Sequence, residues 1–586
     1  MCGIAGWITH PAAEPSDDVL ARMADAIRHR GPDDQGFFRD RTAGLAFAHR
    51  RLSIIDLSNA SHQPMIDAAT GVVLAYNGEL YNFRDLRNDL EKRGHTFLSR
   101  GDVEVVLRSY IEFGIECLAR FAGMFAIAIW DPRSQELHLA RDPTGIKPLY
   151  YTALGSGVAF ASEVKAFRVL PGFKWSPSAL GLRSYIEFGF VFDESQTILE
   201  GVFKLAPGQR MQVRPDGSRQ LHRYFTPGTS DAHDSRGESE RVEELGTVLG
   251  KVVSEHLIAD VPVGLLLSGG LDSSVIAALA ALEAPPLTIT MSFADSGIDE
   301  RPQARAVSEF IGSRHLEVEI TPSDVMREIE VGVAAFDDLF ADWGTITTRL
   351  LYRRCREQGI KVVLVGEGSD ELFGGYGYFD TPRTLNFWQQ IRLYQRYSGR
   401  RWGRTLPSFM RVMGGFLDRS SGDAFDAIRL FETQCQLPNQ YVMKVDKASM
   451  AESIEARAPF LDRRVAELAY RTPHQWLRRG GENKYLLRAL ARSRHLLPES
   501  ISARPKFGAP LAASWMDDHA EFRKFARARV LDGYWTERLD LRAAMQAYFD
   551  GNRSGYPFPH PLSIFQNVAW RLLLLELWSD HYRTAA

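Results

Sequence analysis

From about residue 241 the chain alternates short, mainly apolar segments with helical patterns. Val263–Leu267 is an apolar run of strand length, Ile360–Val365 is another that is interrupted only by Lys361, and Ser273–Leu282 has helical spacing. Strands that are apolar on both faces have to be covered on both faces, and their alternation with helices is typical of parallel sheets. We therefore expect an α/β domain with a doubly wound parallel sheet, followed beyond about residue 380 by a mainly helical part.

The first 210 residues follow a different pattern. Val72–Tyr76 is an apolar strand run that ends at Asn77-Gly78. Met124–Trp130 and Glu136–Arg141 have the form of a hairpin. Strands and helices are mixed here without βαβ order, which favours an α+β domain with antiparallel sheets.

The length of 586 residues is too great for one hydrophobic core. We expect a first domain over residues 1–212, a linker over 213–240 and a second domain over 241–586. Within the linker, residues 226–240 are polar and rich in Gly, Ser and Asp.

Composition narrows the function classes. The net charge is −3, so the chain has no strong field that would attract nucleic acid or an anionic membrane. No apolar stretch of about 18 residues or more is present, and the N-terminus lacks the basic and apolar regions of a secretory signal. We expect a cytoplasmic protein without nucleic-acid or membrane partners. The cysteines show no disulfide or metal-ligand spacing, which is typical of a reduced protein; they are Cys2, Cys117, Cys355 and Cys435.

The thiol of Cys2 is a candidate nucleophile. A cysteine near a terminus can be an incidental small residue, and that alternative stays open for Cys2 taken alone. If Met1 is removed, however, Cys2 carries both a thiol and an α-amine with a pKa near 8. The amine can then serve as the base that activates the thiol, and the thiolate would attack an amide carbonyl.

Such a nucleophile needs an oxyanion hole and a clamp for a charged substrate. Asn77-Gly78-Glu79 offers an amide, an unhindered backbone N–H and a carboxylate, although Asn-Gly between apolar runs is also the strongest local signal of a plain hairpin. Arg51 and Asp102 could supply a guanidinium and a carboxylate, although exposed charges are usually just solvated.

Six motifs together are more specific than each alone. They are Cys2-Gly3-Ile4, Arg28-His29-Arg30-Gly31-Pro32-Asp33, His49-Arg50-Arg51-Leu52-Ser53, Asn77-Gly78-Glu79-Leu80-Tyr81-Asn82, Asp102-Val103-Glu104 and Gly145-Ile146-Lys147-Pro148-Leu149-Tyr150. In this order they resemble the class II glutamine amidotransferase domain, over nearly all of residues 2–210. The resemblance implies an N-terminal-nucleophile hydrolase fold, an αββα sandwich of two antiparallel sheets between helix layers.

The same resemblance implies roles for individual residues. Cys2 would be the nucleophile, and Asn77 and Gly78 would hold the oxyanion, each donor contributing about 3 kcal/mol. Arg51 would bind the α-carboxylate of glutamine, and Glu79 and Asp102 would bind its α-ammonium. The pocket would be lined by Arg51, Leu52, Ser53, Ile54 and Ile55.

A second site is indicated by the segment from Leu267 to Ser274, which reads Leu-Ser-Gly-Gly-Leu-Asp-Ser-Ser between a buried strand and a helix. Backbone N–H groups at a helix N-terminus bind anions, although a tight Gly/Ser-rich turn would read similarly. The loop lacks the lysine of GxxxxGK[ST]. Asp272 within it, and the acids of Glu367–Glu371 after another buried strand, suit Mg²⁺ and phosphate chemistry in one crevice at the carboxyl ends of the strands.

Further motifs extend the likeness to almost the whole chain. They are Asp260–Ser274, Val365–Tyr376, Met443–Met450, Glu455–Asp462 and Lys484–Arg488. They resemble the ATP-pyrophosphatase domain of the glutamine-hydrolysing asparagine synthetase family. The resemblance implies that a carboxylate, most simply that of aspartate, attacks the α-phosphate of ATP, and that ammonia then displaces AMP.

It also implies the residues of this second site. Glu367 would serve formation of the acyl-adenylate and later proton removal, and Lys484 would neutralise phosphate charge. Mg²⁺ would be held by Asp272 and Asp370. ATP would be bound by Leu267, Ser268, Gly269, Gly270, Asp272, Ser273, Met291, Val365 and Gly366.

Two segments depart from the common family pattern near the expected acceptor site: Asp337–Gly344 and Arg504–Pro510. The acceptor could therefore be another carboxylate, on a small metabolite, a sugar acid or a peptide. A β-lactam-forming synthetase needs no ammonia, and Cys2 with its clamp argues against it. A glutamine-sensing protein with an inactive synthetase domain is a further alternative, which the complete Ser268–Ser273 and Glu367–Asp370 segments argue against. The sequence leaves open the ammonia route and the oligomeric state, a homodimer being one option.

Overall fold

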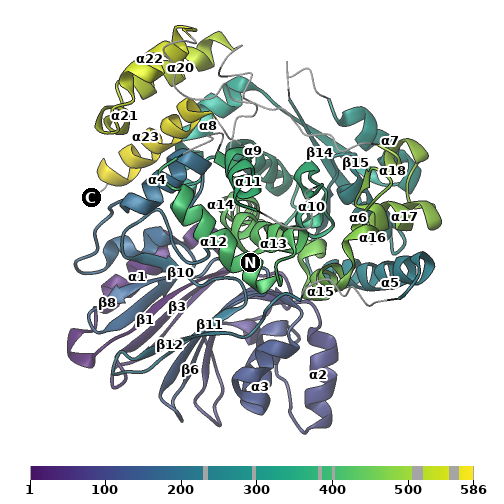
Figure 1. The fold of residues 1–586 in the computed structure, drawn as a ribbon. Coiled ribbons are helices and arrows are strands. Elements are labelled where there is room, and N and C mark those ends of the chain that lie inside the picture. The colour runs from purple at the N-terminus through teal and green to yellow at the C-terminus, as the bar shows by residue number, and fades with distance from the viewer. Residues whose placement is uncertain are drawn as a thin grey trace.

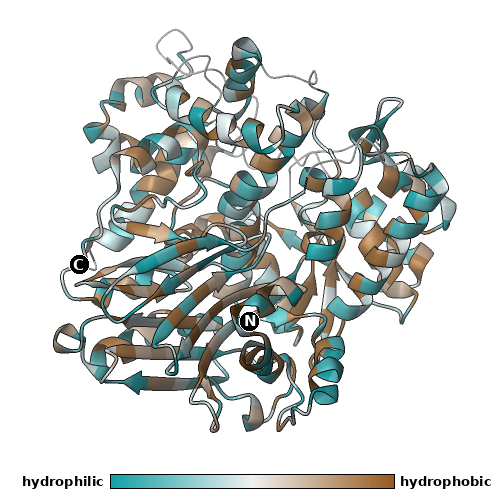
Figure 2. Cartoon of the chain, turned by 60° about the horizontal axis from the view of Figure 1, so that its bottom comes forward, coloured by the Kyte–Doolittle hydropathy of each residue, from teal (hydrophilic) through white to brown (hydrophobic). Residues whose placement is uncertain are grey.

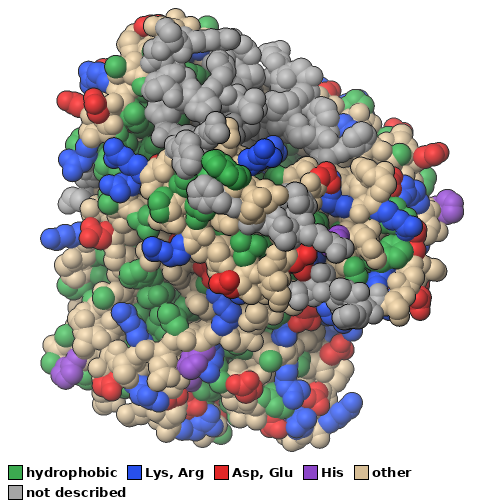
Figure 3. All heavy atoms as spheres, viewed as in Figure 1, with side chains coloured by type: hydrophobic (Ala, Val, Ile, Leu, Met, Phe, Trp, Pro, Cys, Tyr) green, Lys and Arg blue, Asp and Glu red, His purple; other side chains and the backbone are tan. Residues whose placement is uncertain are grey.

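The computed structural model describes residues 2–228, 235–293, 299–342, 344–380, 386–398, 403–504, 516, 519–552 and 567–584. No helix in these ranges is long and apolar enough to cross a membrane. Figure 3 shows acidic and basic side chains interspersed over one face of the molecule.

The first half is a sandwich of two antiparallel sheets (Figures 1 and 2). One sheet has the order β10-β8-β9-β1-β3-β2, from β1 (Gly3–Ile8), β2 (Asp34–Asp40), β3 (Leu45–Arg51), β8 (Tyr150–Leu154), β9 (Gly157–Ala161) and β10 (Val202–Lys204). The other has the order β12-β11-β7-β6-β5-β4, from β4 (Met65–Ile66), β5 (Val73–Leu80), β6 (Gly123–Asp131), β7 (Glu136–Arg141), β11 (Gln209–Val213) and β12 (Arg219–Arg223).

The central strands β1, β3 and β6 are buried on both faces, because the two sheets cover each other on one face and helices or other segments cover the opposite face. The layer between the sheets contains Ile4 of β1 and Val73 of β5, whereas Trp7 of β1 belongs to a different cluster, on the outer face. Helix α1 (Asp17–Ala26) packs against β1 and β3, and α3 (Asp102–Phe113) packs against β5 and α2 (Phe83–Lys92). The αββα sandwich expected from the sequence is confirmed.

The sequence suggested that the strand ends at Asn77-Gly78, but β5 continues through both residues to Leu80. Asn77 pairs with Ala126 and Gly78 with Phe125 inside the β5–β6 ladder. A Cβ atom at Gly78 would lie 2.3 Å from the carbonyl oxygen of Met124. The glycine is therefore needed for the close approach of β6, and the Asn-Gly pair forms no hairpin turn.

The second half contains a parallel sheet in the order β15-β14-β13-β16-β17, formed by β13 (Val263–Leu266), β14 (Leu287–Phe293), β15 (Arg314–Ile320), β16 (Val362–Leu364) and β17 (Glu455–Arg457). The chain adds strands on one side of β13 as far as β15 and then on the other. Because crossovers between parallel strands are right-handed, this reversal puts helices on both faces. The doubly wound sheet is confirmed.

Helices form most of the remaining described chain. Around the sheet these are α5 (Glu238–His256), α6 (Leu271–Ala281), α7 (Arg301–Ile311), α8 (Pro322–Ala335), α9 (Gly344–Glu357) and α10 (Ser369–Leu372). Beyond residue 380 they are α11 (Phe387–Ser398), α12 (Leu406–Arg419), α13 (Ala424–Phe431), a π-helix over Glu432–Tyr441, α14 (Val442–Ala451), α15 (Arg463–Arg471), α16 (His474–Leu477), α17 (Tyr485–Ser493), α18 (Glu499–Ser502), α20 (Ala520–Leu531), α21 (Tyr534–Arg538), α22 (Arg542–Phe549) and α23 (Val568–Thr584). A helical C-terminal part was expected.

Part of the range expected to be a linker is structured. Strand β12 (Arg219–Arg223) pairs with β11 and forms the edge of the second sandwich sheet. Helix α5 begins at Glu238, before the expected domain boundary. Of the range 213–240, residues 229–234 lie outside the described residues. The polar composition misled here because an edge strand exposes one side to water, so polar residues suit it.

Candidate active sites

Cys2 and Asn77 come together from different sheets. Cys2 is buried directly before β1, and its backbone N–H donates a hydrogen bond to the Oδ1 atom of Asn77 at 3.0 Å. Asn77 is itself fully buried on β5. Its Nδ2 donor has no hydrogen-bond partner among the described residues. Buried donors are normally satisfied, so this one is suited to a ligand that is not part of the chain.

The electrostatics of Cys2 favour the thiol form. Burial raises the pKa of the Cys2 thiol, while the positive charge of the amino terminus, a hydrogen bond from the Leu52 backbone and the charge of Arg51 oppose the rise. The thiol is therefore protonated at neutral pH, and a base is needed to activate it.

The predicted glutamine clamp lies at the ends of elements beside Cys2. Arg51, the last residue of β3, donates to the carbonyl oxygens of Ser58, at 2.9 Å, and Asp56. Asp102, the first residue of α3, accepts from the Tyr76 hydroxyl and the Leu80 N–H, both at 2.9 Å. Burial raises the pKa of Asp102, and these two hydrogen bonds oppose the rise.

The carboxylate of Glu79 has a partner that the sequence did not suggest. Its Oε2 atom lies 3.1 Å from the Nη2 atom of Arg457, which is fully buried on β17 of the second half. The segment after β3 also contacts the second half, because the Asp260 N–H donates to the carbonyl oxygen of Ile54 at 2.9 Å. Of the other predicted lining residues, Leu52 is buried, and Ser53 donates its N–H to Asp33. Ile55 is half-buried.

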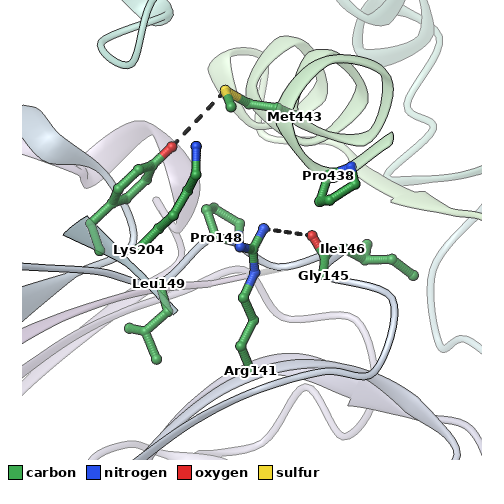
Figure 4. A pocket seen from close by; sticks show the side chains of 9 residues that line it. Arg141, Gly145, Ile146, Pro148, Leu149, Lys204, Pro438 and Met443 are labelled. Carbon is green, nitrogen blue, oxygen red and sulfur yellow. Dashed lines mark hydrogen bonds between the residues drawn. The ribbon is translucent and has the colours of Figure 1, made fainter. Parts of the chain in front are cut away.

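Cys2 is also tied to the second half through Arg30. The Nε atom of Arg30 donates to the Cys2 carbonyl oxygen at 3.1 Å, and its two terminal nitrogens donate to the Asp446 carboxylate at 2.9 and 3.1 Å. Arg30 also pairs with Glu163 at 2.8 Å. A small cavity lies nearby at the junction of the halves, with Arg141, Leu149 and Lys204 on one side and Pro438 and Met443 on the other (Figure 4).

In the second half, two loops meet where β13 and β16 end. Leu265 pairs with Leu364 in parallel register, so the segments after these strands leave the sheet at the same edge. The first forms the loop before α6, where a Cβ atom at Gly269 would lie 2.5 Å from Gln303 and the backbone φ is +68°. Both facts require glycine. In this loop the Ser268 and Ser273 hydroxyls lie 3.0 Å apart.

Two cavities open at this edge. One, of about 200 Å³, contacts Ser268, Gly270, Asp272, Asp370 and Lys484 of the predicted set. The other, of about 330 Å³, contacts Ser268, Asp272, Ser273, Val365, Gly366, Glu367 and Asp370. Leu267, Gly269 and Met291 line neither cavity, although Leu267 and Met291 lie on or beside neighbouring strands. The sequence missed other lining residues: Leu266, Leu271, Glu300, Gly368, Glu371, Tyr376, Tyr441, Asn483, Arg488 and Arg504.

Lys484 joins the two acids predicted to bind metal. Its Nζ atom lies 2.5 Å from Asp272 and 2.7 Å from Asp370. Burial would lower the pKa of Lys484, but the two carboxylates outweigh burial and raise it, so the ammonium is charged. Its backbone φ of +52° lies in the left-handed region, which is uncommon for a lysine and is typical of functional sites.

Asp272 and Asp370 fit a Mg²⁺ ion that is bound jointly by protein carboxylates and nucleotide phosphates. Within the described ranges no group of three or more His, Cys, Asp and Glu side chains could hold a metal ion. Mg²⁺ is commonly held by one or two carboxylates together with substrate phosphates, and Asp272 and Asp370 converge on one point.

Glu367 has the electrostatics of an acid–base group. Burial raises the pKa of its carboxyl, Lys444 opposes the rise and Asp342 adds to it. Lys444 in turn lies 3.3 Å from Asp342. A carboxyl with a raised pKa is suited to take up and release a proton near neutral pH.

Two of the acids in the departing segment Asp337–Gly344 are held by residues of both halves. Asp337 forms an ion pair with Lys447, and its other oxygen accepts the Lys165 N–H at 2.8 Å. Asp338 accepts the Ile198 N–H at 3.1 Å. Both therefore join the halves, and only Asp342, through Lys444, lies beside Glu367. Trp343 and residues 505–510 lie outside the described residues.

Comparisons with known proteins match both halves. A family model described as glutamine amidotransferase domain matches residues 1–225, and one described as asparagine synthase matches residues 244–580. Glutamine-hydrolyzing asparagine synthetase 1 of Bacillus subtilis is 32% identical over 559 residues, 87% of this chain and 87% of its own length. Glutamine-hydrolyzing asparagine synthetase 3 of the same organism is 30% identical over 86% of each chain. A Gibberella zeae protein named amidase chry2 is 34% identical over 65% of this chain and 60% of its own length.

Proposed function

Because the chain belongs to the glutamine-hydrolysing asparagine synthetase family, we propose that it makes asparagine from aspartate, ATP and glutamine. Membership makes it an ATP-dependent carbon–nitrogen ligase that takes its amide nitrogen from glutamine. The proposal adds the acceptor, the residues of both sites and Mg²⁺.

The unpartnered, buried Nδ2 donor of Asn77 beside Cys2 is the observation that supports the first site best. After removal of Met1, the nitrogen that donates to Asn77 becomes the α-amine of Cys2. The amine takes the thiol proton, and the thiolate attacks the glutamine carbonyl. The new oxyanion accepts hydrogen bonds from Asn77 Nδ2 and the Gly78 N–H, donors that are typically worth about 3 kcal/mol each. Ammonia leaves with the proton from the amine, and water then releases glutamate from the thioester.

At the second site an oxygen of the acceptor carboxylate attacks the α-phosphate of ATP, and pyrophosphate leaves. The N–H groups and hydroxyls of Ser268–Ser273 at the start of α6 would hold the leaving pyrophosphate. Lys484 would neutralise its charge. Asp272 and Asp370 would hold Mg²⁺, which supplies positive charge to the phosphate oxygens.

Ammonia then attacks the acyl carbon of the acyl-adenylate. The amide forms, AMP leaves, and the Glu367 carboxylate takes the excess proton from the nitrogen. The raised pKa of Glu367 suits this step, because a base with a pKa closer to neutral pH accepts a proton more readily.

Mass spectrometry of the products from glutamine, ATP, Mg²⁺ and a panel of carboxylic acids tests the proposal. Aspartate should give asparagine and glutamate in equal amounts. If amide formed only from a different acid, the proposed reaction would stand and the proposed acceptor, aspartate, would be wrong. Glutamate without any amide, across a broad panel, would favour a glutamine-sensing protein with an inactive second half.

A further inference from the structure

We propose that the glutamine pocket is a composite of both halves, and that Arg457 of the second half is the positioning residue that holds Glu79 in place for glutamine. The inference rests on the proposed function, since it concerns the glutamine site of the first half.

The ion pair leaves one oxygen of Glu79 for a ligand. Arg457 approaches Oε2 of Glu79 at 3.1 Å, and Oε1 has no partner among the described residues. Glu79 is buried on β5, two residues after Asn77. Alternate residues of a strand point to the same face, so Oε1 is available on the side where Asn77 presents its unpartnered donor.

Arg457 also opposes neutralisation of Glu79. Burial raises the pKa of the Glu79 carboxyl well above its ordinary value, and Arg457 is the strongest of the groups that oppose the rise. A protonated carboxyl attracts the ammonium of glutamine far less than a carboxylate does. Without Arg457, the empty pocket would hold a neutral Glu79 over a wider pH range.

The guanidinium is fixed by the second half on its other sides. Its Nε donates to Glu455 at 2.6 Å, and Nη1 donates to the carbonyl oxygens of His256 and Ile258, both at 2.7 Å. With these three bonds made inside the second half, Arg457 reaches Glu79 as a rigid group. A fixed partner loses little conformational entropy when it orients a carboxylate.

A second contact supports a composite pocket. Asp260, just before β13, donates its N–H to Ile54 and accepts the Asp56 N–H at 2.8 Å. The carbonyl of Asp56 in turn accepts from Arg51, the residue predicted to bind the glutamine carboxylate. The second half therefore contacts the supports of both ends of the proposed substrate.

The same strand leads to the second site. Arg457 lies opposite Leu364, and its carbonyl oxygen accepts the N–H of Val365 at 2.8 Å. Glu367 follows two residues later. A shift of the Val365–Glu367 loop when ATP and the acceptor bind would thus move Arg457, and with it the ion pair to Glu79, through one pair of hydrogen-bonded strands.

The test uses the full-length enzyme with Arg457→Met, Arg457→Lys and a matched control, Arg463→Met. Arg463 also joins the halves, through the Ala119 carbonyl oxygen, but it does not contact the glutamine clamp. Glutamate formation gives KM and kcat for glutamine between pH 6.5 and 8.5. Amide formation from ammonium reports the integrity of the second half.

We expect Arg457→Met to raise KM for glutamine at least about tenfold at pH 7, in line with loss of one partner of a buried ion pair. KM should fall again as pH rises and Glu79 ionises, which a purely structural defect would not produce. Arg457→Lys should raise KM less, because lysine keeps the positive charge but lacks the planar set of N–H donors of the guanidinium. If Arg457→Met does not fold, the KM of the Arg457→Lys variant tests the inference instead.

A KM within twofold of wild type in the Arg457 variants, or an equal rise in Arg463→Met, overturns the inference. So does an equal loss of the glutamine- and ammonium-dependent reactions. A wild-type enzyme that releases no glutamate would instead refute the proposed function itself.

Discussion

The ammonium of Lys484 lies 2.5 Å from the Oδ2 atom of Asp272, although the two residues are 212 positions apart in the chain. Asp370 completes a cluster of one cation between two anions at the edge of the parallel sheet. The Lys484 charge offsets only one of the two carboxylates. On the proposed function, Lys484 would turn to the phosphates of ATP when ATP binds, and the carboxylates would turn to a cation. The effect of the cluster should be confined to the second reaction.

Asp272→Asn should lose amide synthesis by about 10²-fold or more, because electrostatic stabilisation of the phosphates typically contributes at least this much. Glutamate release should survive. Both rates can be read from one assay of glutamate and amide. Asp299→Asn, an exposed acid that pairs with Arg301, is the matched control. Equal loss of both rates in Asp272→Asn would contradict the assignment.

Cys2→Ala should abolish glutamate formation, because no other group replaces the thiolate. Synthesis from ammonium should continue, since that chemistry is assigned to the second half. Intact-mass measurement of the wild type should show a chain that begins at Cys2. A folded Cys2→Ala protein that has lost both reactions would count against the nucleophile assignment.

Asp102→Ala should raise the glutamine requirement steeply, since truncating one partner of a buried charge pair costs about 2–5 kcal/mol. Tyr76→Phe removes a single hydrogen bond to the same carboxylate and should cost less, about 1 kcal/mol. Steady-state kinetics with glutamine measures both, and unchanged kinetics in Asp102→Ala would place the ammonium clamp elsewhere.

Turnover should produce AMP and pyrophosphate in amounts equal to the amide, whatever the acceptor. The loop Ser268–Ser273 contains no lysine and ends at a helix N-terminus, which suits pyrophosphate as the leaving group. Phosphorus NMR identifies the products directly. ADP with orthophosphate would refute adenylation.

The fold should lose stability as the solution becomes mildly acidic. Burial lowers the pKa of His49 and of His256 to about 3, below the ordinary value near 6.5. Below pH 6.5 the unfolded chain takes up protons that the folded chain does not, so unfolding is favoured by up to about 1.4 kcal/mol per pH unit and group.

Melting temperatures between pH 7.5 and 5.5 measure this effect. The decline should be smaller in His49→Gln and His256→Gln than in the wild type. A slope that neither substitution changes would show that other groups dominate the acid sensitivity.

Local pattern in the sequence predicted the elements well, because apolar spacing and caps act over a few residues. The expected hairpin of Met124–Trp130 and Glu136–Arg141 is present as the antiparallel pair β6 and β7, and the helical pattern of Ser273–Leu282 lies in α6 to within one residue at its end. The Asn-Gly signal failed at Asn77 because pairing with β6, more than 40 residues away, outweighs a local turn preference. Strand β12 was missed for a similar reason, since it forms by pairing with β11.

The motifs in the sequence name the residues of the candidate sites. They do not show which other residues these contact. Cys2 and Asn77 are both quoted in the motifs, but their hydrogen bond spans 75 positions. Arg457 stood in a recognised motif without a role, because its partner Glu79 belongs to the other half of the chain. The segment Asp337–Gly344 was expected to lie near the acceptor site, but the sequence did not show that Asp337 and Asp338 are buried in ion pairs with Lys447 and Lys204.

Arg30 lies without solvent exposure between Glu163 of its own half and Asp446 of the other. Removing one member of a buried ion pair typically costs about 3–5 kcal/mol. A chimaera that takes its first half from this protein and its second from a distant relative would leave the Arg30 guanidinium without its second-half partner, unless that relative has an acid at the position of Asp446. We therefore expect the two halves to be inherited and to diverge together, as one unit of selection.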